Sequence, residues 1–460
     1  MDAEDGLGVR LVSAVRAGDA DAVRALLEEG ADPDAVDAVD ASGLSALGLA
    51  VAAYDAPVAD VLVEGGADPD RALPDGTTPL WRAIDGGSYA VFSAVLGTEP
   101  RLRLPEATRE RFIALARDWY ETGVEEELRR RTGAVGPAVT ERVADGEYDW
   151  VDQVSLGGLA VRAGHGGILT ALEWAFRILT PVDDLVARAV RHPDEQHADW
   201  SAICWVLAGR RSHETWSAVV AHRHHRDPAH RRFVADYLRL RSFVDPGRHH
   251  YGKKETELLI AWAAEETDSA VLATVLNALT EYEHPDQEAV GLRHAGHPDP
   301  RVRREVPYTL VTNDGLRSPA ARDAVLVLTR DPDVEVRLRA CEVGADDEAL
   351  WPEVTRALLP MAESSDAAAR RGAAVALAAS RDQAPAVAEA LMSLLDEDDL
   401  LVRLEAAWGL ARRDDPRTEE AYERVGPLGP GFEHDHRALE LWNWRWRRQE
   451  ADSPSGPAAD

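Results

Sequence analysis

The side chains best suited to chemistry are gathered in one histidine-rich segment. Residues 221–227 read Ala-His-Arg-His-His-Arg-Asp, and His230 follows. His222 and His225 are three residues apart, so on a helix they would face the same side and could bind one metal ion from adjacent turns. Neither of the two cysteines lies nearby to complete a structural zinc site. The segment also follows a helix expected over 214–220, whose carboxyl end is stabilised by cationic side chains. We therefore predict no metal and no cofactor, and keep a metal-binding regulator that uses this histidine cluster as an alternative.

A glycine-rich segment, residues 156–167, is the second candidate for a binding or catalytic site. A phosphate-binding loop would end in Gly-Lys-Ser or Gly-Lys-Thr at the start of a helix, and no such ending follows. The run from His165 to Gly167 is similar to the oxyanion loop of esterases, but the sequence has no Gly-x-Ser-x-Gly elbow to supply a nucleophile. We expect a turn or short hairpin here, and we predict no catalytic residues and no enzyme.

Length and charge restrict the class of protein. The 460 residues exceed one hydrophobic core and predict about three domains or one repeat array. The formal net charge of −31 argues against general binding to nucleic acid or to an anionic membrane. No apolar run approaches the roughly 18 residues of a membrane span, and the acidic start, Met-Asp-Ala-Glu-Asp, is unlike a targeting signal. With only two cysteines we expect a reducing, cytoplasmic location.

A short motif recurs in the first hundred residues. Residues 28–34 read Glu-Glu-Gly-Ala-Asp-Pro-Asp and return at 64–70 as Glu-Gly-Gly-Ala-Asp-Pro-Asp. Apolar residues at helical spacing lie between the copies. Gly30 and Gly66 are suited to the left-handed residue that ends a helix. The pattern predicts a turn followed by two short antiparallel helices in each repeat.

Residues 76–81, Gly-Thr-Thr-Pro-Leu-Trp, give the most specific signal. Thr78 is suited to cap a helix and Pro79 to its first turn. Together with the Gly-Ala-Asp endings, these residues resemble the ankyrin repeat over about residues 7–98. Trp81 stands where that family usually has histidine, and the third copy lacks the Gly-Ala-Asp end.

The ankyrin resemblance implies a protein-binding surface. In that family the finger-like turns contact partners, here at about 37–42 and 73–77, which makes Asp40 and Asp75 the expected contacts, with Trp81 behind them. The first hundred residues carry 19 acidic and 5 basic side chains, a net charge of −14. We therefore expect a basic protein partner at this face.

A second motif is marked by regularly spaced aspartates. The aligned residues are Asp194, Asp227, Asp268, Asp299, Asp333, Asp366 and Asp399. Each is expected to cap a helix, because its carboxylate can accept hydrogen bonds from the first amides of that helix. The fourth position after the aspartate is often arginine, as in Arg231, Arg303, Arg337, Arg370 and Arg403. Each arginine is expected to pair with that carboxylate or with one of a neighbouring repeat.

This pattern resembles the HEAT-like helical repeat, whose Asp-x-x-Val-Arg signature opens the second helix of each pair, over about residues 186–412. Stacked units of this kind share one elongated core. Leu272 and Ala198 interrupt the arginine column. Pro307 is expected to kink its helix, and an extra loop is expected near 242–254.

Residues 191–254 form a basic band, with 12 basic and 7 acidic side chains and nine of the 15 histidines. The residues singled out in it are His222, His224, His225, Arg231 and Arg232. The band is expected either to bind an acidic partner or to pack against the acidic amino-terminal half. Some DNA glycosylases are built of HEAT-like repeats, and Trp200, Trp205 and Trp216 lie in the band. A nucleic-acid-binding protein or glycosylase-like enzyme is therefore an alternative function for this chain. HEAT-like bilin lyases are a further alternative, and the resemblance to them rests on the repeat type alone.

The carboxyl-terminal region is rich in tryptophan and arginine. Residues 441–448 read Leu-Trp-Asn-Trp-Arg-Trp-Arg-Arg. Leu439, Trp442 and Trp446 are predicted to share a helix face that closes the last repeat, with a partner contact as the alternative. The prolines, glycine and serines of residues 449–460 predict disorder.

The sequence thus predicts an all-α protein with two stacked helical-repeat solenoids joined by a helical connector. The predicted parts are an ankyrin module (1–98), a connector with a Gly-rich loop (99–185), a HEAT-like array (186–415), an aromatic cap (416–448) and a disordered tail (449–460). The expected function is a non-enzymatic scaffold or adaptor for protein partners, bound on concave repeat surfaces.

Overall fold

The computed structural model describes residues 2–32, 44–244, 252–429, 431–432 and 434–452. The chain forms two compact units, residues 1–246 and 247–460. The boundary between the units falls within the array predicted over 186–415. The boundary predicted after residue 98 instead lies inside the first unit, whose core is continuous there.

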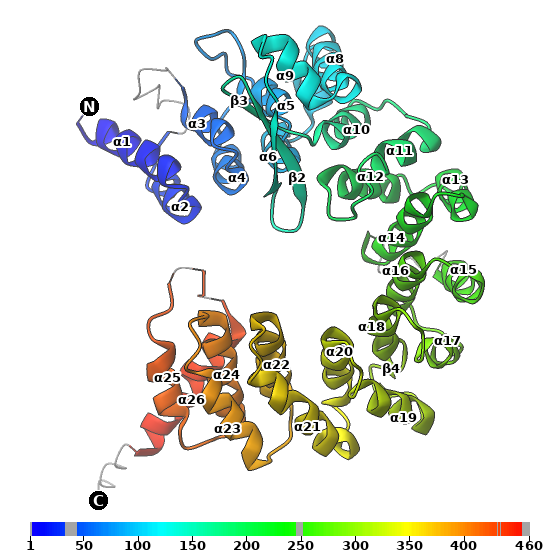
Figure 1. Cartoon of the computed structure of the whole chain (residues 1–460). Helices are drawn as coiled ribbons and strands as arrows, with labels where there is room; N and C mark the ends of the chain where they lie inside the picture. The colour runs from blue at the N-terminus through cyan, green and yellow to red at the C-terminus, as the bar shows by residue number, and fades with distance from the viewer. Residues whose placement is uncertain (1, 33–43, 245–251, 430, 433, 453–460) are drawn as a thin grey trace, which may run out of the picture. The chain divides into compact units, whose positions relative to one another are not determined.

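The first unit is built mainly of short helices that stack one after another (Figure 1). Its helices are α1 (Asp2–Ala17), α2 (Ala20–Glu28), α3 (Ala46–Ala52), α4 (Ala56–Glu64), α5 (Pro79–Gly86), α6 (Tyr89–Leu96), α7 (Pro100–Arg103), α8 (Glu106–Thr122), α9 (Val124–Thr132), α10 (His165–Ala175), α11 (Val182–Ala189), α12 (Ala198–Gly209), α13 (His213–Ala221), the 3-10 turn η1 (His222–His224) and α14 (Pro228–Val244). The pairs α1–α2, α3–α4 and α5–α6 are the predicted antiparallel helix pairs.

Local signals set the ends of these helices as expected. Thr78 caps α5 by accepting the backbone N–H of Trp81 (3.1 Å), and Pro79 occupies the first turn. Gly30 and Gly66 follow the ends of α2 and α4 with φ of 99° and 100°. A side chain is strained at such angles, so glycine is the residue best suited to these positions.

The third helix pair ends without Gly-Ala-Asp, and an arginine substitutes for it. Arg103 donates from Nη2 to the carbonyl oxygen of Leu96 (2.9 Å), the last residue of α6, and from Nε to Asp70 (2.6 Å). The apolar core then continues without a break into α8 and α10, through residues such as Phe112 and Ile168. The ankyrin part is therefore covered by further helices of the same unit.

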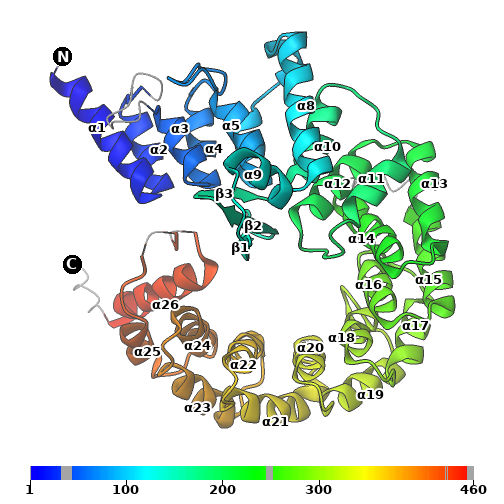
Figure 2. The ribbon, with the colours of Figure 1, turned by 45° about the horizontal axis from the view of Figure 1, so that its top comes forward.

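A three-stranded antiparallel sheet, which the sequence did not predict as a sheet, interrupts the helices of the connector. Its strands are β1 (Val139–Ala144), β2 (Trp150–Leu156) and β3 (Leu159–Arg162), in the order β1-β2-β3. Gly157 and Gly158 form the two-residue turn between β2 and β3, with φ of 61° and 84°, which confirms the expected short hairpin. The sheet lies beside α9 and α5 (Figure 2). Val154 and Val161 pack from it against Trp119 of α8.

The second unit is a regular succession of helix pairs (Figure 1). Its elements are α15 (Gly252–Glu265), α16 (Ser269–Thr280), α17 (Gln287–His294), α18 (Pro300–Thr309), β4 (Val311–Thr312), β5 (Gly315–Leu316), α19 (Pro319–Leu328), α20 (Val334–Gly344), the 3-10 turn η2 (Glu348–Leu350), α21 (Trp351–Ala362), α22 (Ala367–Ala379), α23 (Pro385–Leu394), α24 (Leu400–Arg412), α25 (Thr418–Val425) and α26 (His436–Asp452). The helices α16, α18, α20, α22, α24 and α26 pack in that order along one layer. Pro307 is buried inside α18, which continues only to Thr309 before the β4–β5 turn.

The repeat aspartates cap helices, with one exception. The N-caps of α16, α18, α20, α22 and α24 are Asp268, Asp299, Asp333, Asp366 and Asp399, and each carboxylate accepts a backbone N–H. In the first unit Asp227 accepts the N–H of Ala229 at 2.9 Å. The prediction is wrong for Asp194, because the N-cap of α12 is His197, whose Nδ1 accepts the N–H of Asp199 (3.1 Å).

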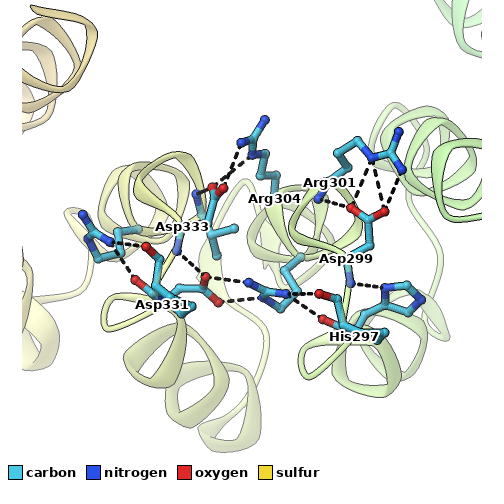
Figure 3. A network of polar contacts seen from close by, with 11 residues as sticks. His297, Asp299, Arg301, Arg304, Asp331 and Asp333 are labelled. Carbon is cyan, nitrogen blue, oxygen red and sulfur yellow. Dashed lines mark hydrogen bonds and ion pairs between the residues drawn. The ribbon is translucent and has the colours of Figure 1, made fainter. Parts of the chain in front are cut away.

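Two arginines of the column, Arg303 and Arg370, join successive repeats by pairing with a carboxylate of the next one. Arg337 and Arg403 instead donate to backbone carbonyl oxygens of their own loops. Arg303 pairs with Asp331 (2.7 Å) and Arg304 with the capping Asp333 (3.0 Å) of the next repeat, as Figure 3 shows for Arg304. Farther along the array, Arg370 and Arg371 pair in the same way with Glu397 and with the capping Asp399 of the next repeat. Arg303 does not pair with its own cap, Asp299, which instead binds Arg301 (2.7 Å).

The predicted orientation of the last helix is wrong. In α26 the buried residues are Leu441 and Trp444, which are 2% and 5% exposed. Leu439, Trp442 and Trp446, expected to close the array, are about half exposed, at 47%, 56% and 48%. The helix also extends to Asp452, so the first four residues of the predicted disordered tail are helical, and residues 453–460 lie outside the described part.

Candidate functional site

Of the predicted ankyrin contacts, Asp75 lies in a well-bonded turn. The carboxylate of Asp75 accepts hydrogen bonds from the backbone N–H of Thr77 (3.0 Å), from the Thr77 hydroxyl (2.6 Å) and from Arg82 (2.8 Å). The hydrogen bonds from Thr77, followed by that from Arg82, hold the pKa of Asp75 far below its usual value. Trp81 is half-buried against the core of the unit. Asp40 lies outside the described residues.

An open groove lies next to these repeats, between α4, α6 and the turn that joins β1 to β2. Its volume is about 730 Å³. We call it the hairpin groove and define it by Tyr54, Asp60, Tyr89, Asp145, Glu147, Tyr148, Asp149 and Arg162. The groove exists only because the β1–β2 turn folds back beside the ankyrin helices, which the sequence analysis did not predict.

Contacts made by Asp145, Arg162 and Tyr54 hold the β1–β2 turn in place beside the ankyrin helices. Asp145 pairs with Arg162 (2.7 Å) and accepts the N–H of Ala90 (3.1 Å) at the start of α6. Arg162 also lies over the ring of Tyr54, 4.4 Å from its centroid. The Tyr54 hydroxyl donates to the carbonyl oxygen of Gly86 (3.0 Å), and burial raises the pKa of Tyr54 to about 12. The floor of the groove is therefore rigid, neutral and well bonded.

The rim of the hairpin groove is acidic. Among the described residues, no cationic side chain lies within ion-pair distance of Asp60, Glu147 or Asp149. Asp149 is half-buried, accepts a hydrogen bond from Ser201 (2.6 Å), and has its pKa raised by burial. Tyr148 is 76% exposed and its hydroxyl donates to Glu147. Carboxylates beside an exposed aromatic ring are suited to lysine or arginine side chains.

Several side chains of the basic band are bonded within the first unit. His222 contacts Asp183 (2.9 Å), and Arg232 donates to the carbonyl oxygen of Pro193 (2.7 Å). Arg231 donates to the carbonyl oxygens of His225 (2.9 Å) and Arg226 (3.2 Å) in its own loop. His224 is exposed.

Two alternatives for the basic band are a metal site and a surface for nucleic acid. The rings of His225 and His230 stack at 3.7 Å between centroids. Over the described ranges, no group of three or more His, Cys, Asp or Glu side chains is placed to hold a metal ion. Trp200, considered for stacking on nucleic acid bases, is fully buried and donates to Asp236 (2.9 Å), whereas Trp205 is 52% exposed.

A small pocket that sequence reasoning missed lies where α8, α9, β2 and α10 meet. Its volume is about 200 Å³, and its lining includes His165, His192 and Asp199. His165 stacks on Trp119 (5.0 Å between centroids), and burial lowers its pKa to about 3, so the imidazole is neutral. Burial raises the pKa of Asp199 to about 7, while its Oδ1 accepts the N–H of Gly167 (2.6 Å). The Asp199 carboxyl thus occupies the place at the amino-terminal end of α10 where the free backbone N–H groups of a helix usually bind an anion.

Comparison with family models identifies both repeat types. Residues 11–103 match ankyrin repeats, in three copies, and residues 256–343 match HEAT repeats. The chain therefore carries ankyrin repeats followed by HEAT repeats, as the motifs indicated. A search of curated proteins finds no match. Within the described ranges no helix is both long and apolar enough to cross a membrane.

Proposed function

We propose that this chain is a non-enzymatic scaffold for other proteins, and that its first unit binds a basic segment of a partner in the hairpin groove. The observation that carries the proposal is the set of three carboxylates, Asp60, Glu147 and Asp149, which lie on one groove without a cationic partner among the described residues. A lysine- or arginine-rich segment would supply the missing charges.

The repeat types support a binding role. Ankyrin and HEAT arrays expose long surfaces built from successive repeats, and proteins of this construction commonly bind other proteins there. The net charge of −14 over the first hundred residues favours the approach of a basic partner over that of an acidic one.

The proposed contact differs in place from the finger residues. Asp75 already accepts three hydrogen bonds, so a new cation would compete with Arg82 for the same carboxylate. We keep Asp75 and Trp81 as secondary contacts of the proposal. The main contact is assigned to the hairpin groove, where the acidic charge is not neutralised.

The proposal is tested by binding of a fluorescein-labelled arginine-rich peptide to the full chain, measured by anisotropy. The double substitution Asp60→Asn and Glu147→Gln removes two rim charges without changing shape. We expect it to weaken binding by about tenfold, since each exposed charge pair contributes about 0.7 kcal/mol and two pairs are lost. The matched control is Glu106→Gln with Glu110→Gln, two exposed carboxylates of α8.

Three results would contradict the proposal: no binding to the unchanged protein, equal weakening by the α8 control, or equal binding of a glutamate-rich peptide. Binding that involves only a few charge pairs also weakens as salt is added. We therefore expect the difference between the two double variants to shrink in high salt.

A further inference from the structure

The last helix of the second unit exposes an apolar stripe. Leu439, Trp442 and Trp446 are separated by three and four residues, so they follow one side of α26, and each is about half exposed. Terminal repeats of a stacked array usually carry a polar outer surface, because a bare apolar end is costly in water. The two half-exposed tryptophans of α26 depart from that pattern.

A groove adjoins the stripe, between the end of α24 and α26. Its volume is about 1060 Å³. We call it the terminal groove, and its lining is Ala411, Arg412, Asp414, Glu440, Asn443, Trp444, Trp446, Arg447 and Arg448. Trp446 belongs to both the groove and the stripe, so the two form one continuous surface.

The acidic side chains of the terminal groove are held by indole groups. Asp414 accepts the N–H of Trp444 (2.8 Å), and Glu440 accepts the N–H of Trp408 (2.5 Å). These hydrogen bonds fix both carboxylates against the protein.

Two arginines of the terminal groove, Arg447 and Arg448, have no carboxylate partner among the described residues. Within the described part of the chain, Arg447 donates to the carbonyl oxygen of Asn443 (3.3 Å), and Arg448 lies over the ring of Trp444 at 5.1 Å. No described carboxylate lies within ion-pair distance of either arginine. Arg445, by contrast, pairs with Glu419 (3.0 Å). Arg447 and Arg448 thus remain available to an acidic ligand.

We infer that the terminal groove and the stripe together bind an acidic amphipathic segment of a partner protein. Apolar side chains of the segment would cover Trp442 and Trp446, and its carboxylates would pair with Arg447 and Arg448. This second site goes beyond the proposed function, because it lies in the other unit and selects ligands of the opposite charge.

A protein segment fits this surface better than a nucleic acid does. Tryptophan and arginine also bind single strands, but every phosphate along a strand adds a negative charge. The chain carries a net charge of −31, which repels a long polyanion more than a short peptide with a few carboxylates.

The experiment measures anisotropy of a fluorescein-labelled peptide of about 15 residues, with leucine on one helical face and glutamate on the other. The first variant is Trp442→Ala with Trp446→Ala, and the second is Arg447→Glu with Arg448→Glu, both in the full chain. The control for the first is Trp205→Ala, since Trp205 is 52% exposed in the first unit. The control for the second is Arg101→Glu with Arg226→Glu, two exposed arginines of the first unit.

We expect both test variants to weaken binding by about tenfold or more, as removal of central tryptophan and arginine contacts does, and both controls to bind as the unchanged chain does. Lack of binding to the unchanged chain, or unaltered binding by the tryptophan variant, would overturn the inference. Equal binding of a peptide with lysine in place of glutamate would overturn it too. A thymidine oligonucleotide that binds while the peptide does not would assign the surface to nucleic acid. Self-association that the tryptophan variant abolishes, without peptide binding, would assign it to a second copy.

Discussion

Arg303 reaches across to Asp331 in the next repeat and donates from Nε and Nη2 to the two carboxylate oxygens, each at 2.7 Å. Its third nitrogen, Nη1, donates to the carbonyl oxygens of His297 (2.7 Å) and Pro298 (3.0 Å). The two side chains are only 12% and 7% exposed. Burial opposes ionisation of Asp331, but hydrogen bonds from Arg303 and from the Asp333 amide outweigh it and lower the pKa. One arginine therefore ties its own loop to the following repeat.

Loss of one member of this pair should loosen the junction between two repeats. We expect Arg303→Met to destabilise the second unit by about 2–4 kcal/mol, because it leaves a nearly buried carboxylate unpaired. The measurement is amide hydrogen exchange of the full chain, with faster exchange in α18 and α20. The control is Arg301→Met, whose pair with Asp299 is exposed and should cost less than about 1 kcal/mol. Equal effects of both substitutions would show that the link between repeats adds no stability.

Asp199 should make the first unit more stable at low pH than at high pH. Its pKa is about 7 in the folded chain and near 3.8 without burial. Between those values the folded state holds a proton that the unfolded state has released, so this term loses stability as pH rises from about 4 to about 7. Asn can accept the same Gly167 N–H without a charge. We expect Asp199→Asn to raise the melting temperature more at pH 8 than at pH 5.

Thermal unfolding of the two proteins at both pH values measures this difference. The exposed Asp60→Asn should shift the melting temperature equally little at each pH. A constant offset between Asp199→Asn and the unchanged chain across this range would contradict the role assigned to burial.

Gly87 should tolerate no side chain, because β3 lies against the end of α5. An added Cβ would lie 1.9 Å from the carbonyl oxygen of Arg162 and 2.4 Å from Cε1 of His165. Its φ is 71°, and that of Gly66 is 100°, where a Cβ would meet no atom within 4 Å. We expect Gly66→Ala to lower the free energy of unfolding by about 1–2 kcal/mol, from backbone strain alone. We expect Gly87→Ala to cost about 2 kcal/mol more, from the added overlap.

Denaturant unfolding of the full chain compares the two glycine variants. Similar losses would mean that the contact between β3 and α5 can separate without cost. If Gly87→Ala separates β3 from α5 in this way, the variant should also bind the basic peptide more weakly at the hairpin groove. Peptide binding therefore gives a second measurement of the same contact.

Two tryptophans of α26 should behave in opposite ways. Trp444 is 5% exposed, and its indole donates to Asp414, so Trp444→Ala should destabilise the array by about 3–5 kcal/mol. Trp442 is 56% exposed, so Trp442→Ala should stay within about 0.5 kcal/mol. Thermal unfolding separates them, and a large loss with Trp442→Ala would show that the outward face belongs to the core after all.

Features set by a few neighbouring residues could be predicted. Thr78 with Pro79 fixed the start of α5, and Asp333 fixed that of α20, because a cap depends only on its own side chain and the next amides. Asp194 failed because His197, three residues on, takes the cap of α12. The repeat period of the aspartates likewise revealed the stacking of the second unit.

The repeats, their helix ends and the acidic character of the first hundred residues can be predicted from the amino-acid sequence, since these follow from short-range patterns. The tertiary structure alone selects which side of α26 is buried. Leu441 and Trp444 form an apolar stripe as Leu439, Trp442 and Trp446 do, and packing against α24 selects one of the two. The tertiary structure also decides that Asp60 and Glu147 share one groove. Those carboxylates are far apart along the chain, and the hairpin brings them together through Asp145 and Arg162, a contact that no local pattern encodes.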